Sequence, residues 1–165
     1  MRGILLGVAL PVVAAMALGC AASAGGGSGA TTYRKDLGNV TPYDFSRHTQ
    51  RILGRYHFEF EQMDSTENYQ LFKTRWLQRY PLDDEITMGV VEIQTQLTLR
   101  ARTRGGGAAG TADLRSAEMI AQNMARLRDS NQWILTVFSP EFKEYIDEIA
   151  QELKTEFTSG IRVFR

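Results

Sequence analysis

The 165-residue sequence has one cysteine and two histidines, and neither sign of charge is in excess, with 19 basic and 19 acidic residues. A chain with a single cysteine has no internal disulfide framework, so its stability must come from a packed core. The balanced charge argues against a general nucleic-acid binder, which needs a basic surplus to displace counterions. We therefore expect one domain of ordinary size with no nucleic-acid partner.

The sequence also lacks the motifs of common catalytic sites. No Gly-x-Ser-x-Gly elbow occurs, and no Lys-Ser or Lys-Thr of a phosphate-binding loop follows the three glycines at 105 to 107. We interpret these glycines as a loop. The protein is expected not to be an enzyme.

The single cysteine lies where an apolar segment ends and a run of small residues begins. The apolar stretch at 3 to 18 follows Arg2 and is too short for a comfortable transmembrane helix, so residues 1–19 are expected to be a signal peptide that is removed. Residues 20–32 comprise Cys20 and a flexible Gly, Ser and Ala tether with a root-mean-square reach of about 20 Å. Residues 33–165 are predicted to form a single α+β domain in the periplasm.

The five residues Met16-Ala17-Leu18-Gly19-Cys20 resemble the lipobox of bacterial lipoproteins. The resemblance implies a diacylglyceryl group on Cys20 and further acylation such as palmitate, and two or more acyl chains anchor a protein durably. This covalent lipid is the only cofactor that we expect. Ala21 in place of Asp implies, by the same resemblance, the outer membrane with the domain facing the periplasm. The alternative is a conventional signal peptide cut after Ala24, with an incidental Cys20.

Two segments carry the caps and the periodicity of helices. The first helix is predicted over 42 to 53, with Thr41 as N-cap and Gly54 as its end. The second begins at Ser139-Pro140 and carries a continuous apolar stripe on one face. After it, residues 161 to 164 are expected to form a short closing strand.

Alternation of apolar and polar residues predicts an antiparallel sheet. One strand is expected over 56 to 61, a second over 69 to 77, and the longest over 91 to 102, with Val91 on its dry face. Residues 112 to 128 favour a helix by local propensity and a strand by context, because the long strand needs a partner. Both alternatives stay open. The predicted fold is α+β, with an antiparallel sheet, an N-terminal helix and a long amphipathic C-terminal helix on one face.

Two acidic motifs are candidates for metal or acid/base chemistry. His57, Glu59 and Glu61 would share one face of a predicted strand, but no second His-rich segment accompanies them, so we interpret them as a solvated face and expect no metal site. Asp83-Asp84-Glu85 lacks the spacing of a calcium loop and is interpreted as a loop with capping or turn residues. We interpret His48 as part of a solvated helix face.

A stripe of arginines is the candidate for contact with an anionic partner. Arg100, Arg102 and Arg104 alternate on the wet face of the long strand, and Arg126 and Arg128 lie nearby if the next segment folds back. Such a stripe suits anionic lipid headgroups, lipopolysaccharide or an acidic partner surface. The alternative is an ordinary solvated face.

These observations favour a membrane-anchored lipoprotein of the cell envelope that acts as a non-enzymatic binding or assembly component. Its expected partners are the membrane, through the lipid, and another envelope protein or a lipid. A second hypothesis is a lipid or small-molecule carrier with an apolar pocket under the C-terminal helix. That pocket would be lined by Tyr56, Phe58, Phe60, Trp76, Trp133 and Phe157. A third, a metal-dependent enzyme, depends on His57, Glu59 and Glu61.

Overall fold

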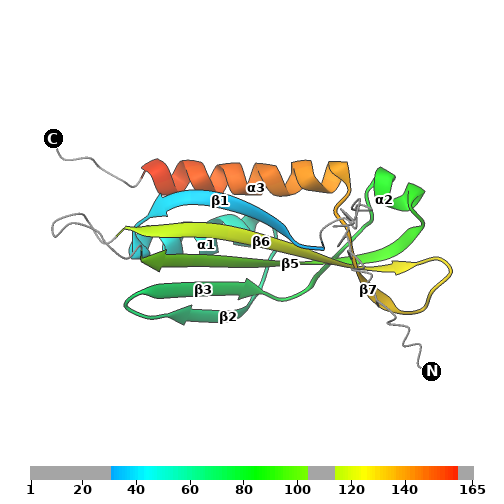
Figure 1. Cartoon of the computed structure of the whole chain (residues 1–165), viewed down its shortest axis with the longest axis horizontal. Helices are drawn as coiled ribbons and strands as arrows, with labels where there is room; N and C mark the ends of the chain where they lie inside the picture. Colours follow the sequence, from blue (N-terminus) through cyan, green and yellow to red (C-terminus); the bar gives the residue numbers. More distant parts are fainter. Residues whose placement is uncertain (1–30, 104–113, 160–165) are drawn as a thin grey trace, which may run out of the picture.

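The computed structural model describes residues 31–103 and 114–159, and Cys20, Arg104, the glycines at 105 to 107 and residues 161 to 164 lie outside them. Within the described residues the chain forms a seven-stranded antiparallel sheet and three helices, which confirms the predicted α+β class (Figure 1). The strands are β1 (Tyr33–Val40), β2 (Phe60–Ser65), β3 (Tyr69–Thr74), β4 (Leu77–Arg79), β5 (Val90–Thr103), β6 (Arg115–Leu127) and β7 (Trp133–Thr136). The helices are α1 (Pro42–Arg55), α2 (Asp83–Thr87) and α3 (Pro140–Ser159).

The sheet is built around one long hairpin, β5 and β6. The strand order is β1-β6-β5-β3-β2, and two short strands extend it, because β4 also pairs with β5 and β7 also pairs with β6. Along one edge of β6, β1 covers residues 115–121 and β7 covers residues 123–126, so these two strands lie end to end. The segment that allowed two predictions, 112 to 128, is therefore a strand from Arg115 onward, paired along its length with β5.

Both long helices pack on the same side of the sheet, and no described helix covers the side that carries Arg100 and Glu118, which we call the open face. In Figure 1, α1 lies behind the strands and α3 runs along β1. Their apolar stripes meet the inward side chains of β1, β3, β5 and β6 in one core. Fully buried members include Leu37, Phe45, Ile52, Leu97, Leu99, Met119, Phe142, Ile146, Leu153 and Phe157. None of the described helices is long and apolar enough to cross a membrane.

Helix α1 begins where its caps predict and ends later than predicted. The Thr41 side-chain oxygen accepts the N–H of Asp44 at 3.1 Å, which satisfies one free donor of the first turn. Gly54 does not end the helix: His57 takes the left-handed conformation, with φ of 62°, and the N–H of Phe58 reaches back to the Leu53 carbonyl at 3.0 Å. Because this turn occupies the residues up to 59, the strand expected from 56 begins only at Phe60.

Three other local predictions need correction. The strand expected over 69 to 77 is divided, since β3 ends at Thr74 and β4 starts at Leu77. Val91, expected on the dry face, is 38% exposed, because a bulge between Val90 and Glu92 turns it outward. The predicted loop at 83 to 85 is instead the first turn of α2.

Candidate functional site

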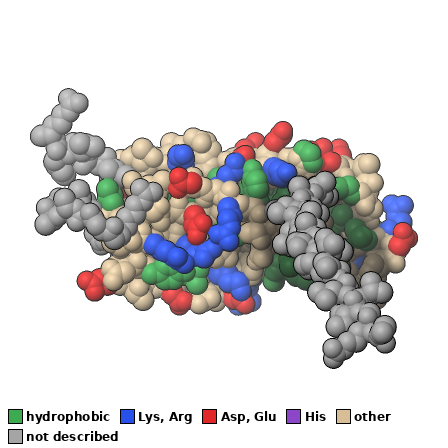
Figure 2. Space-filling view, viewed as in Figure 1, with side chains coloured by type: hydrophobic (Ala, Val, Ile, Leu, Met, Phe, Trp, Pro, Cys, Tyr) green, Lys and Arg blue, Asp and Glu red, His purple; other side chains and the backbone are tan. Residues whose placement is uncertain are grey.

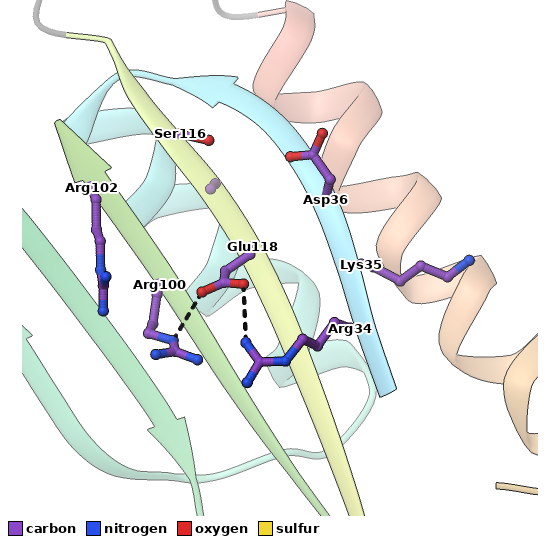
Figure 3. A pocket seen from close by; sticks show the side chains of 8 residues that line it. Arg34, Lys35, Asp36, Arg100, Arg102, Ser116 and Glu118 are labelled. Atoms are coloured by element: carbon purple, nitrogen blue, oxygen red, sulfur yellow. Dashed lines mark hydrogen bonds and ion pairs between the residues drawn. The ribbon is translucent and has the colours of Figure 1, made fainter. Parts of the chain in front are cut away.

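The open face of the sheet carries an ionic cluster centred on Glu118 of β6. Arg100 of β5 lies directly opposite Glu118 in register, with its Nε 3.2 Å from Oε1. Arg34 of β1 approaches from the other side, with Nη1 3.5 Å from Oε2. Figure 3 shows both guanidinium groups turned toward this carboxylate. The cluster therefore joins three neighbouring strands on the face that no described helix covers.

Arg102 extends the cluster along β5. It lies two residues beyond Arg100 on the same face, and its guanidinium carbon is 5.3 Å from the ring centroid of Tyr69. No carboxylate among the described residues forms an ion pair with Arg102. Figure 2 shows the basic side chains grouped around an acidic one on this face. We call Arg34, Arg100, Arg102 and Glu118 the arginine cluster.

A shallow cavity of about 360 Å³ lies over the arginine cluster. Asp36 also lines it, and its Oδ1 accepts the N–H of Gly38 at 3.1 Å. Three guanidinium groups thus face two carboxylates, which leaves the cavity with one excess positive charge. The Nε of Arg100 is buried and, although near Glu118, is not aligned for a hydrogen bond. Glu118 therefore does not use all the donors of Arg100.

Lys35, beside the cavity, does not contribute its charge to it. Its ammonium group points toward α3 and donates to Asp147 Oδ2 at 2.8 Å, as the side-chain direction in Figure 3 shows. The hydrogen bond to Asp147, with a smaller contribution from Tyr33, raises the pKa of Lys35. Tyr33 also donates to Asp147 Oδ1 at 3.0 Å. These hydrogen bonds connect β1 to α3. The Lys35 side chain therefore lies on the helix side of β1, while Arg34 lies on the open face.

The remaining arginines of the predicted stripe are separated from the cluster. Arg126 is on the open face but is paired with Glu92, with its Nε 2.9 Å from Oε2. That hydrogen bond lowers the pKa of Glu92 and raises the pKa of Arg126. Arg128 is exposed beyond the end of β6. Arg104 is outside the described residues.

The structure does not bring the predicted acidic motif together as a site. His57 lies in the left-handed turn after α1, not on a strand face with Glu59 and Glu61. Glu61 pairs with Lys73, with Nζ 3.1 Å from its carboxylate. Across the described ranges, no three His, Cys, Asp or Glu side chains are placed to hold a metal ion.

His48 is not on a solvated helix face. Its side chain is 12% exposed and lies between α1 and α3, with Nδ1 3.2 Å from Glu156 and Nε2 3.7 Å from Asp44. Arg51, one turn further along α1, also contacts Glu156, at 2.8 Å. The prediction for His48 was wrong because α3 packs across this part of α1.

Four of the six aromatic residues proposed as a pocket lining belong to the core or pack against it: Tyr56, Phe58, Phe60 and Phe157. Phe157 packs on Phe45 with ring centroids 5.8 Å apart, and Phe60 packs edge-on against Phe72 at 5.6 Å. The ring of Tyr56 packs edge-on against the ring of Tyr145 of α3, and Phe58 is buried in the same core. None of the six proposed aromatic residues lines any of the five main cavities of the described residues.

Sequence reasoning missed two members of the cluster, Arg34 and Glu118. Arg34 lies in β1, which has no clear alternation, and Glu118 lies in the segment whose secondary structure stayed open. The available indication was charge complementarity: folded as a hairpin, β6 places Glu118 opposite Arg100.

Comparison with known proteins adds no further constraint. The chain matches no protein-family model, and no curated protein has a significantly similar sequence. The chemistry of the arginine cluster must therefore carry the functional conclusion. Guanidinium groups held on a firm sheet bind carboxylates and other planar anions through paired N–H donors.

Proposed function

We propose that this protein is a lipid-anchored lipoprotein of the cell envelope that binds an acidic segment of another envelope protein on the open face of its sheet. Acyl chains on Cys20 hold it at the periplasmic side of the outer membrane. It acts as a binding or assembly component without catalytic activity. The observation that carries the proposal is the arginine cluster on the sheet face that no described helix covers, with Arg102 lacking a carboxylate partner among the described residues.

The arrangement of the helices supports this choice of surface. The N-terminal helix α1 and the long amphipathic helix α3 bury the apolar side of the sheet. No described helix covers the charged side, and the two strands of the central hairpin are paired on both of their edges. A rigid face of this kind holds guanidinium groups in place before a partner arrives, which lowers the entropy lost on binding.

Glu118 has a specific role in this proposal. It holds Arg34 and Arg100 in position while the site is empty and competes with an incoming carboxylate for the same donors. Arg102 is oriented by the ring of Tyr69 and keeps N–H groups available for a carboxylate. A partner carboxylate would therefore bind first at Arg102 and share the donors of Arg100.

The packed aromatic core supports a binding component over a carrier. A carrier needs an apolar cavity under α3, but the rings of Phe45, Phe142 and Phe157 fill that space and are fully buried. The cavities of the described residues are lined mainly by charged and polar side chains.

Native mass spectrometry of the protein extracted from membranes in mild detergent tests the proposal. We expect a complex with a second protein that is lost in the double variant Arg34→Glu, Arg102→Glu. Arg47→Glu, the same charge reversal at one exposed position of α1, is the control and should retain the complex. Glu118→Gln should retain or strengthen it, because the competing carboxylate is removed. A complex that survives the double variant would contradict the assigned surface.

A further inference from the structure

Exposed apolar side chains are concentrated at one end of the sheet. Of the nine large hydrophobic side chains that are exposed in the described residues, seven lie in or beside α2, the start of β5 and β7. We call these seven residues the apolar end: Tyr80, Ile86, Met88, Val91, Ile134, Leu135 and Val137. The other two, Tyr43 and Met63, lie in α1 and β2.

Strand pairing brings the parts of the apolar end to the same place. Gly89, between α2 and β5, accepts the N–H of Arg128 through its carbonyl at 3.0 Å, which holds the α2 turn to the end of β6. β7 pairs with β6 just before that end, with Ile134 opposite Ala125. Tyr80 and Val91 line one cavity of about 500 Å³. In Figure 1, α2 and β7 both lie at the end of the sheet away from the β2–β3 turn.

The first described strand begins beside the end of β7, opposite the middle of β6. Tyr33 is paired with Ala121, and the next described pair along that edge of β6 joins Asn123 to Thr136 of β7. The start of β1 therefore lies next to the end of β7, and five residues of β6, roughly 17 Å, separate Ala121 from Arg126. The segment between Cys20 and the domain is expected from its composition to be a flexible tether with a reach of about 20 Å. That reach is comparable to the distance from the start of β1 to the end of β6, so an anchor on Cys20 would let the apolar end meet the bilayer.

We propose that the apolar end docks on the surface of the bilayer that carries the lipid anchor. This inference rests on the anchor of the proposed function. The side chains are those that enter an interface: aliphatic residues, methionine and Tyr80, which is 93% exposed and whose ring suits the headgroup level. The anchor gives the apolar end a high effective concentration at the bilayer surface. A small apolar surface is therefore enough to hold the domain in one orientation.

Apolar contact, not attraction to anionic lipid, drives this docking. The charged groups next to the apolar end have opposite signs, since Asp83 opens α2 and Arg128 follows β6, and both are exposed. Arg79, at the base of the cavity beside Tyr80, is neutralised by Glu85 at 2.6 Å. Docking should accordingly persist on vesicles with few anionic lipids and at raised salt.

Docking at the apolar end determines the distance between the arginine cluster and the membrane surface. Glu118 and Arg126 are eight residues apart on β6, which at a rise of about 3.3 Å per residue separates them by roughly 26 Å along the strand. A domain resting on its apolar end therefore holds the arginine cluster well above the headgroups of its own membrane. The cluster then faces a protein segment in the periplasm and not the lipids that carry the anchor.

Fluorescence quenching by lipid measures this orientation. A second cysteine is introduced at Leu135 or at Met63, which have nearly equal exposure, 50% and 49%, and lie on opposite edge strands. Each full-length, lipidated protein is labelled with a small fluorophore and placed in phosphatidylcholine vesicles with brominated acyl chains. We expect loss of fluorescence at position 135 and none at position 63, unchanged when phosphatidylglycerol or salt is added.

The outcomes separate docking from anchoring, because the mass of each protein reports the acyl chains on Cys20. If the lipid is present and neither label is quenched, or both are quenched equally, the docking inference is overturned while the anchor stands. If no lipid is present on Cys20, the anchor itself is wrong. If the label at position 135 is shielded from solvent only when a second protein is bound, the apolar end contacts that protein and not the bilayer. This result would also overturn the inference.

Discussion

The ring of Tyr33 packs against the ring of Phe138, with the two centroids 5.6 Å apart. Tyr33 is the first residue of β1, and Phe138 lies between β7 and α3, so this contact joins the start of the domain to the start of its last helix. Phe138 also stacks on Phe142 within α3, at 5.6 Å. The position of the start of β1 relative to the start of α3 depends on this group of rings.

Replacing Phe138 by alanine should lower the free energy of unfolding by about 3 kcal/mol, since a buried ring is removed and two ring contacts are lost. Urea unfolding followed by circular dichroism measures the change. The control is Tyr43→Ala in α1, where the ring is 68% exposed and the cost should stay within about 0.5 kcal/mol. Equal effects at the two positions would show that Phe138 is not part of the packed core.

The buried ion pair between Arg79 and Glu85 makes a second prediction. Glu85 is 2% exposed, accepts two guanidinium bonds at 2.6 and 2.7 Å, and also accepts the N–H of Leu82 at 2.8 Å. Glu85→Ala leaves a half-buried guanidinium without its partner and should cost about 3 kcal/mol in unfolding free energy. Asp83→Ala, at an exposed residue of the same short helix, should cost much less. A small loss at Glu85 would mean that the pair is solvated.

Two glycines should respond to alanine in opposite directions. Gly38 has φ of +82° at the bulge of β1, whereas Gly54 lies inside α1, and a Cβ would meet no atom within 4 Å at either position. Gly38→Ala should destabilise the protein by about 1 kcal/mol, because L-residues disfavour this conformation. Gly54→Ala should stabilise it by about 0.5–1 kcal/mol through helix propensity. Thermal melting of both variants measures the signs, and equal signs would contradict the assigned backbone conformations.

The pair formed by Glu92 and Arg126 predicts a dependence on pH. The hydrogen bond from Arg126 lowers the pKa of Glu92 below its ordinary value of 4.5, so the folded state favours the carboxylate more than the unfolded state does. The stabilisation is present above pH 4.5 and is lost as the pH falls through the lowered pKa. The melting temperatures of wild type and Glu92→Gln should therefore differ at neutral pH and converge in acid. A gap that widens in acid would contradict the pair.

The fold class was predictable because its main elements have strong local patterns. The alternation of β5 and the caps and stripe of the terminal helix follow directly from the periods of strand and helix. β1 was missed because its bulge at Leu37 and Gly38 breaks the alternation. The secondary structure of β6 stayed ambiguous because its alanines and methionines favour a helix. Pairing with β5 makes it a strand.

Only two of the four members of the arginine cluster were predictable from the sequence. Arg100 and Arg102 share one face of a strand whatever lies beside it, so their spacing alone places them together. Arg34 and Glu118 join them only through the register of β1, β6 and β5. Register is set by packing across the whole sheet, and local pattern does not contain it.

The most direct test of the account is the intact mass and N-terminal peptide of the protein purified from membranes, compared with the Cys20→Ala variant. We expect a chain that begins at Cys20 and carries a diacylglyceryl group with further acylation, and we expect the variant to lose both the lipid mass and its membrane association. An unmodified chain that begins after Ala24 would contradict the anchor and, with it, the proposed orientation of the domain.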